Sequence, residues 1–302
     1  MRVLVLGGSG FVTGAIVRAA LSAGHETWSV TRGTRPVPAG VHHLEVDRND
    51  HRALTSLLGG IDGGWDLVVD GIAFGPEDTR QDLELFASRA THLVLLSTDA
   101  VLDLSVPVFP KSDACGYSSV AYGAGKRACE LVLIESAASA MRWTILRPSH
   151  VYGPGAPLGC QPWHLRDPDL LARLRAGESL RLIGAGCILQ QPVYVGDVAG
   201  AVLSCAGAVD ANGRAFFLAG PETVEARRYY EYVAASVGAR LRIVETPIRE
   251  FVNARPDLAF VGEHRAYGDV GKTLTAAGLA PPQTHLRAGI GVTVKWLDRR
   301  AT

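Results

Sequence analysis

The first 150 residues alternate short apolar runs with longer amphipathic segments, and this alternation constrains the fold more than any other feature. Parallel strands need long crossover connections, usually helices, so the pattern predicts strand–helix–strand units around a parallel sheet. Strands are expected at Val3–Leu6, Glu26–Val30, His43–Val46, Leu67–Val69, His92–Leu96 and Trp143–Leu146. The clearest helices are expected at Phe11–Ser22, Glu77–Ser88 and Tyr122–Ser139.

After Pro148 the sequence becomes irregular, rich in Gly and Pro, before order returns near residue 192. A strand at Pro192–Val195, a helix at Asp197–Cys205 and a strand at Ala215–Leu218 are expected to complete the sheet. The remainder mixes helices with one strand, at Leu241–Val244. We therefore expect two parts: a nucleotide-binding domain of residues 1–155 and about 190–222, and a substrate-binding lobe of about 156–189 and 223–302.

A glycine-rich loop, Gly7 to Gly14, directly follows the first expected strand and opens a helix. Small residues at this point let the backbone approach a pyrophosphate, which the N–H groups and dipole of the helix N-terminus then favour. The position between strand and helix makes this more than a chance glycine pattern. The fold class predicted is α/β, a Rossmann-type doubly wound parallel sheet that binds a dinucleotide, with a smaller C-terminal lobe.

The second expected strand is followed by Thr31-Arg32-Gly33-Thr34-Arg35, where an acidic residue would bind the 2′-hydroxyl of NAD. Arg32, and Arg35 with it, suit a 2′-phosphate, because a guanidinium matches phosphate geometry. The cofactor is expected to be NADP or NAD, with NADP favoured.

Tyr122 and Lys126 lie four residues apart at the start of a predicted helix, so their side chains share one face. A phenol has a pKa near 10, and a nearby ammonium with an oxidised nicotinamide would favour the phenolate. Thr98 follows the fifth strand, and its hydroxyl is expected to hydrogen-bond the reacting oxygen. Successive strand residues point to opposite sides, so Ser97, Thr98 and Asp99 cannot all face the site if the strand stays regular.

With these motifs in this order, the sequence resembles the extended short-chain dehydrogenase/reductases, the NAD(P)-dependent epimerase/dehydratase family. Segments 147–154, 193–199 and 218–222 are similar to family signatures. The resemblance implies that Tyr122 is the acid/base, Lys126 its partner and Thr98 the orienting hydroxyl. It implies that segment 148–151 lines the nicotinamide and that Asp47 contacts adenine. The expected cofactor-binding residues are Gly7, Gly10, Phe11, Val12, Arg32, Asp47, Ala73, Lys126, Pro148 and Val151.

Segments 31–33, 46–50 and 66–70 look most like a subgroup that includes chloroplast stem-loop RNA-binding proteins. Other positions depart from the family pattern. Thr13 replaces the third glycine of the loop, and Ala100 replaces the glutamate of dehydratases, which argues against a 4,6-dehydratase. Gln190 or Gln191 stands where an arginine typically binds the sugar-nucleotide diphosphate.

Three functions remain open. The first is an epimerase that oxidises and re-reduces a hydroxyl-bearing carbon of a sugar or sugar nucleotide through a transient ketone. The second is an NADPH-dependent reductase or dehydrogenase of a keto-sugar or related polyol. The third is a non-catalytic Rossmann-fold protein that binds RNA or senses redox state. The residues expected at the substrate are Asp99, His150, Trp163, His164, Gln191 and Arg265.

Composition narrows the partners. Thirty Lys and Arg balance thirty Asp and Glu, so nucleic acid is an unlikely partner and a small molecule the expected one. No apolar run is long enough to span a bilayer and no signal pattern opens the chain, which favours a cytoplasmic protein. The five cysteines never form a Cys-x-x-Cys pair, and no metal site is expected. The family likeness encourages a homodimer built on the helices at Glu77–Ser88 and Tyr122–Ser139.

Overall fold

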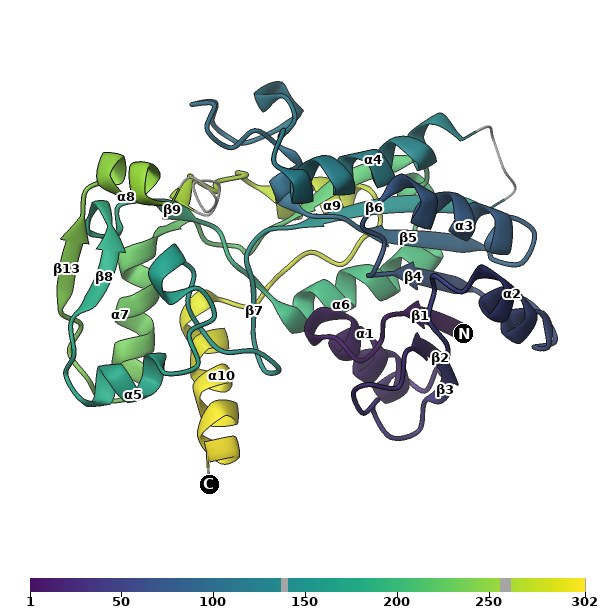
Figure 1. Ribbon diagram of the computed structural model, residues 1–302, viewed down its shortest axis with the longest axis horizontal. Helices are drawn as coiled ribbons and strands as arrows, with labels where there is room; N and C mark the ends of the chain where they lie inside the picture. The colour runs from purple at the N-terminus through teal and green to yellow at the C-terminus, as the bar shows by residue number, and fades with distance from the viewer. Residues whose placement is uncertain (137–140, 256–261, 302) are drawn as a thin grey trace.

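A seven-stranded parallel sheet forms the centre of the protein (Figure 1). The computed structural model describes residues 1–136, 141–255 and 262–301. The strand order is β11-β6-β5-β4-β1-β2-β3. The strands are β1 (Arg2–Leu6), β2 (Glu26–Thr31), β3 (His42–Glu45), β4 (Leu67–Asp70), β5 (His92–Leu96), β6 (Arg142–Pro148) and β11 (Arg214–Leu218). The order reverses between β1 and β4, and open parallel sheets bind ligands beyond the strand ends at such a point. The doubly wound sheet predicted from the sequence is confirmed.

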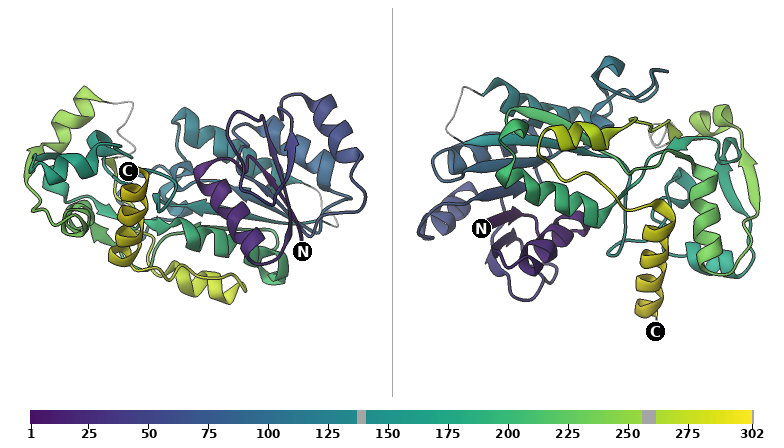
Figure 2. Two further views of the ribbon diagram at one scale, coloured as in Figure 1. Left: turned by 90° about the horizontal axis from the view of Figure 1, so that it is seen from below. Right: turned by 180° about the vertical axis from the view of Figure 1, so that it is seen from behind.

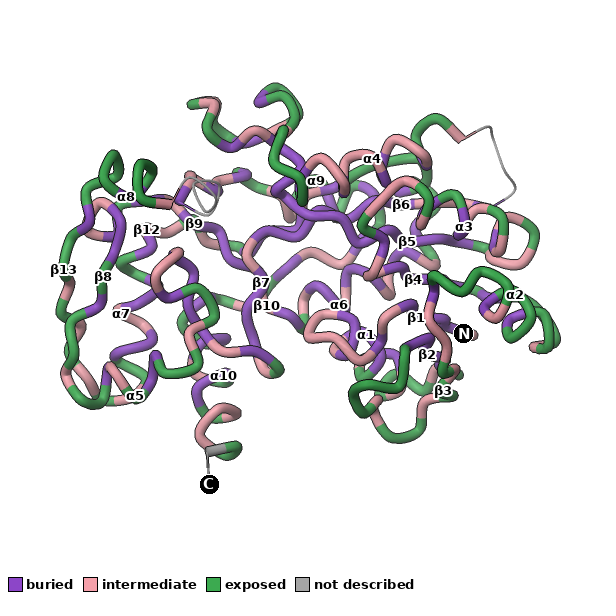
Figure 3. Tube along the Cα trace, in the orientation of Figure 1, coloured by how far each residue is buried: buried purple, intermediate pink, exposed green. Residues whose placement is uncertain are grey.

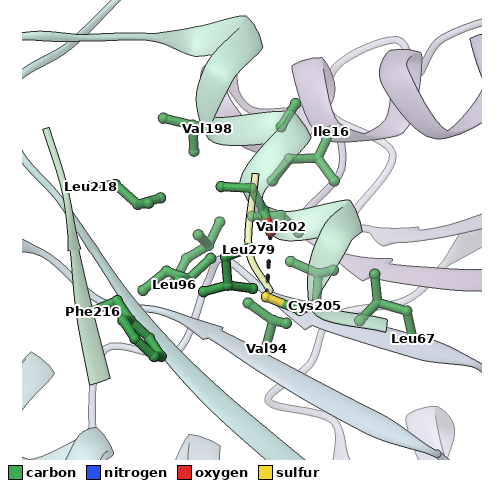
Figure 4. Packing of buried hydrophobic residues seen from close by; sticks show 14 of the residues in the cluster. Ile16, Leu67, Val94, Leu96, Val198, Val202, Cys205, Phe216, Leu218 and Leu279 are labelled. Atoms are coloured by element: carbon green, nitrogen blue, oxygen red, sulfur yellow. Dashed lines mark hydrogen bonds between the residues drawn. The ribbon is translucent and has the colours of Figure 1, made fainter. Parts of the chain in front are cut away.

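Helices cover both faces of this sheet (Figure 2). One face carries α1 (Phe11–Ser22), α6 (Val195–Ser204) and α9 (Val270–Ala276), and the other carries α2 (His51–Gly59), α3 (Pro76–Phe86) and α4 (Ala121–Glu135). The strands supply both cores by alternation: Val3 and Val5 face α1 and α6, whereas Leu4 and Leu6 face the opposite layer. Figure 4 shows the first core, with Ile16, Val198 and Val202 packed over the strands.

The second lobe has its own apolar core, a cluster distinct from the two at the sheet. Figure 3 shows where buried residues lie along the chain. Its elements are α5 (Leu170–Arg175), β8 (Leu180–Ile183), α7 (Ala226–Ser236), β13 (Ile243–Thr246), α8 (Ile248–Ala254) and α10 (Leu286–Ala301). Tyr229, Tyr230 and Val233 of α7 and Ile290 of α10 are fully buried in or beside this core. Three strand pairs complete the structure: β8 with β13, β9 (Leu189–Gln190) with β12 (Val224–Glu225), and β7 (Val151–Tyr152) with β10 (Val193–Tyr194).

Three expectations need correction. The strand expected at Pro192–Val195 was to join the main sheet, but β10 pairs only with β7, outside it. Residues 223–302 do not all belong to the second lobe, because Leu274 of α9 packs in the first core of the sheet. The helix expected to reach Ser139 ends at Glu135, and residues 137–139 lie outside the described residues. In the described parts of the chain, no helix has the length and apolarity needed to cross a membrane.

The buried side chain of His92 should make the free energy of unfolding depend on pH. The residue is fully buried in β5, and its Nε2 lies 2.8 Å from Thr144 Oγ1. Burial and the charge of Arg142 lower the pKa of His92 to about 4. The unfolded chain therefore binds a proton between about pH 6.5 and 4 that the folded chain does not, so stability falls as the pH falls through this window. We expect a loss of about 2–4 kcal/mol from this residue, measured by urea unfolding at pH 7 and pH 4. If His92→Gln loses as much stability as the wild type between pH 7 and pH 4, the loss does not come from His92.

Candidate active site

The glycine loop leaves the N-terminus of α1 open toward a ligand. Gly7 takes a φ of +88°, which favours glycine, and turns the chain after β1. Gly10 precedes the helix, and no side chain caps it, so the first-turn N–H groups remain available to an anion. Thr13, in place of the third glycine, donates from Oγ1 to the Gly7 carbonyl oxygen at 2.5 Å. Its methyl group fits because position 71 is glycine, where a Cβ would lie 2.2 Å from Thr13 Cγ2.

Beside this loop lies a cavity of about 440 Å³, here called the cofactor-side cavity. Four of the expected cofactor residues line it: Gly7, Gly10, Arg32 and Asp47. Arg35 and Arg48 line it too. Its two lining carboxylates already accept hydrogen bonds. Asp47 accepts from Asn49, and Asp78 from the backbone N–H groups of Phe74 and Gly75. These residues fit the adenosine half of a dinucleotide, with guanidinium groups at the end of β2.

Two expected cofactor residues lie elsewhere. Ala73 is fully buried, and its backbone N–H donates to Asp70, so it lines neither cavity. Its neighbours Ile72 and Phe74 line the cofactor-side cavity instead. Phe11 is also absent from both linings; its ring contacts the guanidinium of Arg166.

A second cavity of about 420 Å³, here called the catalytic cavity, gathers the expected catalytic residues. Thr98, Tyr122 and Lys126 all line it. So do Val12, Pro148 and Val151, expected at the nicotinamide, and Asp99, His150 and Arg265, expected at the substrate. The two cavities share Phe74, so they lie next to each other as the two halves of a dinucleotide require. The catalytic roles of these side chains remain predictions.

Two glycines let α4, the helix that carries Tyr122 and Lys126, lie close to the loops at Phe74 and Ala100. A Cβ added at Gly123 would lie 2.1 Å from the Ala100 carbonyl oxygen, and one at Gly125 would lie 2.6 Å from that of Phe74. No residue larger than glycine fits at either position, so the backbone of α4 lies directly against the backbone of these two loops. This contact holds Tyr122 beside Thr98. Sequence reasoning missed this signal, although both glycines stand between Tyr122 and Lys126.

Tyr122 is held as a protonated phenol. Burial raises the pKa of Tyr122 above its ordinary value, while a hydrogen bond with Thr98 and the charge of Arg166 act in the opposite direction. A protonated phenol beside the Thr98 hydroxyl is able to donate to a substrate oxygen. The side chain remains accessible, because 46% of the residue surface is exposed.

The ammonium of Lys126 contacts the end of β5 and the ring of Phe74. The buried ammonium donates to the Leu96 carbonyl oxygen at 2.8 Å and lies 4.9 Å from the centre of the Phe74 ring. Burial lowers the pKa of Lys126. Arg166 is the cation whose charge lowers the pKa of Tyr122 in this structure, and the effect expected of Lys126 together with an oxidised nicotinamide stays a prediction. Lys126 lines the catalytic cavity.

The strand-end segment departs from regular alternation. β5 ends at Leu96, and Thr98 precedes a short 3₁₀ helix at Asp99–Val101. Ser97 donates to Glu130 at 2.6 Å. Asp99 accepts from Arg265 Nε at 2.9 Å and from the Tyr267 hydroxyl at 2.7 Å. Asp99 and Arg265 thus line the cavity as a mutually neutralised pair.

Three residues expected at the substrate do not line the catalytic cavity. Gln191 donates to the carbonyl oxygens of Gly220 and Gly268 and accepts from the Tyr267 N–H, so its amide serves the backbone. Gln190 lines the catalytic cavity in its place. Trp163 packs against Phe251 outside the cavity.

His164 is the third. Its Nδ1 contacts Asp167 at 2.9 Å, and its Nε2 accepts from the N–H of Arg181 in β8 at 3.2 Å, so both ring nitrogens have partners away from the cavity. The cavity is lined by the next two residues, Leu165 and Arg166. Nothing in the sequence indicated that Leu165 and Arg166 would line the cavity in place of Trp163 and His164, because this depends on how the loop folds back.

His150 lies in the cavity as an uncharged ring. Burial and the charges of Arg166 and Arg265 lower the pKa of His150 to about 3. The imidazole is therefore neutral near pH 7 and adds no positive charge to the site.

A parallel sheet with an open glycine loop and a Thr–Tyr–Lys cavity defines an enzyme of the short-chain dehydrogenase/reductase type, dependent on NAD(P). The chain belongs to the NAD dependent epimerase/dehydratase family, whose model matches residues 77–219. It is an oxidoreductase or epimerase of that type.

The curated relatives of this chain include a stem-loop binding protein and two reductases. The chain is 24% identical to the chloroplast stem-loop binding protein of 41 kDa b of Arabidopsis thaliana over 74% of its length, and it spans 60% of that relative. It is 26% identical to a 2-alkyl-3-oxoalkanoate reductase of Stenotrophomonas maltophilia, covering 79% of this chain and 76% of the relative. It is 28% identical to a 2′-dehydrokanamycin reductase of Streptomyces kanamyceticus, covering 89% and 76%.

Solved structures share the fold over the whole chain. A UDP-glucose 4-epimerase of Thermotoga maritima with UDP-glucose has a TM-score of 0.78, 18% identity and full coverage of both chains. A UDP-glucose 4-epimerase of Thermus thermophilus in complex with NAD has a TM-score of 0.74, 23% identity and 99% coverage of each chain.

Proposed function

We propose that this protein is an NADP(H)-dependent reductase, reversible as a dehydrogenase, of a ketone on a small polyol or keto-sugar. The observation that carries the proposal is the pair Arg32 and Arg35 in the cofactor-side cavity, where the lining carboxylates are engaged elsewhere. Guanidinium groups favour a 2′-phosphate, and NADPH is a cofactor that exchanges at each turnover in reductases. Two of the curated relatives are named as reductases of oxo compounds.

The cofactor fits the residues that line the two cavities: the uncapped N-terminus of α1 would receive its diphosphate, and the two cavities would hold its two halves. When bound, NADPH supplies a hydride to the carbonyl carbon. Thr98 orients the carbonyl oxygen by a hydrogen bond. Tyr122 donates its phenolic proton to that oxygen, giving the alcohol, and then recovers a proton from solvent. Lys126, which lines the same cavity, would hold the ribose of the cofactor.

Epimerisation of a sugar nucleotide, the leading hypothesis from the sequence, would use the same three side chains. It has less support at the substrate end. Gln191 is committed to backbone groups, Gln190 is uncharged, and Arg265 is neutralised by Asp99. The cavity therefore offers a diphosphate less positive charge than the customary arginine would.

One experiment separates the two reactions. The purified protein is denatured and any released dinucleotide identified, and NADPH oxidation is then followed with a panel of keto-sugars and 3-oxo acids. We expect little retained cofactor and ketone-dependent oxidation of NADPH. Tightly retained NAD⁺, with interconversion of UDP-glucose and UDP-galactose and no net redox change, would instead establish the epimerase.

Cofactor preference gives a direct prediction. Arg32→Ser should weaken NADPH binding roughly 10- to 100-fold, the range for a lost charge-assisted contact, and leave NADH binding within about twofold. Energy transfer from tryptophan to the nicotinamide measures both constants. Arg240→Ser, at an exposed position remote in sequence from the cavity linings, is the control. Equal weakening of both cofactors by Arg32→Ser would show that Arg32 does not read the 2′ position.

A further inference from the structure

Arg166 has an unfavourable backbone conformation. Its φ is +49°, in the left-handed region, which side chains with a Cβ seldom adopt. Among the described non-glycine residues, only Ala185 shares this feature. Strain of this kind persists where surrounding contacts hold it, and it clusters at ligand sites.

The surrounding contacts that hold Arg166 come from both sides of its loop. The Arg166 N–H donates to the Gly159 carbonyl oxygen at 3.2 Å, and the Asp167 N–H donates to that of Leu158 at 3.0 Å. Gly159 has a φ of +121°, and a Cβ there would lie 1.6 Å from the His164 carbonyl oxygen. Only glycine therefore allows the loop to close in this shape.

Helix α7 anchors the same loop from the second lobe. The hydroxyl of Tyr229 accepts from the Gly159 N–H at 3.1 Å, and that of Tyr230 accepts from the N–H groups of Cys160 and Gln161, each at 3.0 Å. Both tyrosines are fully buried. The backbone that carries Arg166 is thus fixed by a packed core.

The guanidinium held in this way lies at the catalytic cavity without an acidic partner in the described structure. Arg166 lines the cavity, and its Cζ lies 5.0 Å from the centre of the Phe11 ring. The adjacent acid, Asp167, is engaged by His164 and by the Asp169 N–H. The two other cations of the cavity have partners: Arg265 binds Asp99, and Lys126 donates to a carbonyl oxygen.

We propose that Arg166 binds an anionic group, a carboxylate or a phosphate, of the ligand in the catalytic cavity. The inference rests on the proposed reductase function and narrows its substrate class to oxo compounds that carry such a group. A planar guanidinium pairs with a carboxylate or phosphate through two parallel hydrogen bonds, which makes it selective for these anions. A guanidinium without an acidic partner keeps its hydrogen-bond donors available for such a ligand.

The anion has two possible sources. Arg166 shares the cavity with Tyr122 and His150, where a substrate would react. It also contacts Phe11, the first residue of α1, which follows the glycine loop. A substrate anion is the source we propose, and the diphosphate of the cofactor is the other.

The test uses the protein saturated with NADPH and two matched probes, 4-oxopentanoate and its methyl ester. Binding is read by stopped flow from the initial change in nicotinamide fluorescence on mixing, before the slower loss of fluorescence that hydride transfer to the ketone would cause. We expect the wild type to bind the anion roughly 10- to 100-fold more tightly than the ester. Arg166→Asn should remove this preference, because asparagine tolerates the left-handed backbone and carries no charge. Arg166→Lys should retain part of it, and Arg240→Asn all of it.

The affinity of each variant for NADP⁺ identifies the source. A tenfold loss of NADP⁺ affinity in Arg166→Asn, with the probe preference unchanged, would assign the anion to the cofactor. Equal or absent binding of the two probes to the wild type, with normal NADP⁺ affinity in Arg166→Asn, would overturn the inference. A wild type that binds no NADPH would instead refute the proposed function. Thermal unfolding of Arg166→Asn should match the wild type, since a charge at a ligand site does not hold the fold.

Discussion

Tyr122→Phe is expected to lower kcat for carbonyl reduction by roughly 10²- to 10⁴-fold, the usual contribution of a positioned proton donor. The phenyl ring preserves the packing of α4 against the loop at Ala100, while the proton that the substrate oxygen must receive is lost. Stopped-flow measurement of NADPH oxidation gives the rate, and fluorescence titration gives the cofactor affinity, which should change less than about threefold.

The pH profile provides a second readout of the same residue. Because burial holds the pKa of Tyr122 above its ordinary value, the phenol stays protonated from neutral to mildly alkaline pH. The reduction rate should be flat there and fall only as the pH rises through that pKa, whereas the reverse oxidation should rise with pH. Substantial activity in Tyr122→Phe with the same profile would assign the proton to another group.

Arg147→Met should destabilise the protein by about 3–5 kcal/mol, the range for breaking a buried ion pair. Arg147 is almost fully buried and donates from Nε and Nη2 to both oxygens of Glu130, at 2.8 and 2.7 Å. Glu130 belongs to α4, the helix that carries Tyr122 and Lys126, and is itself completely buried. Removing the guanidinium leaves this carboxylate with only Arg127 and Ser97 as partners.

Urea unfolding measures the loss. The double variant Arg147→Met/Glu130→Leu removes both charges and should recover most of the stability, because the buried carboxylate that has lost its bidentate partner is gone. A double variant as unstable as Arg147→Met alone would mean that the loss comes from the other contacts of Arg147, with Asp113 and Phe217.

The sequence predicted the sheet well because hydrophobic alternation is a local signal. β5 matches its expected range, His92–Leu96, and α1 matches Phe11–Ser22 at both ends. It predicted β10 less well: two residues of apolar sequence do not reveal whether they pair with the central sheet or with β7.

At the site, the expected residues that do line the catalytic cavity are those whose position follows from a strand end or a helix turn, such as Thr98 and Lys126. Gln191 and His164, which do not line it, occupy irregular segments where long-range hydrogen bonds decide which side chain faces the cavity. Arg166 went unnoticed for the same reason, since its direction depends on a left-handed residue closed by Gly159.

The buried link from Asp99 to Arg265 and Tyr267 determines the route by which a substrate reaches the cavity. It joins the end of β5 to a segment more than 160 residues further along the chain and closes that wall of the site. Opening there would separate an ion pair inside the protein, which is unfavourable. Tyr122, Leu165 and Arg166 are, by contrast, exposed to solvent. A ligand should therefore enter on the side where Leu165, Arg166 and Tyr122 are exposed, so that the guanidinium and the phenol both stand at the entrance.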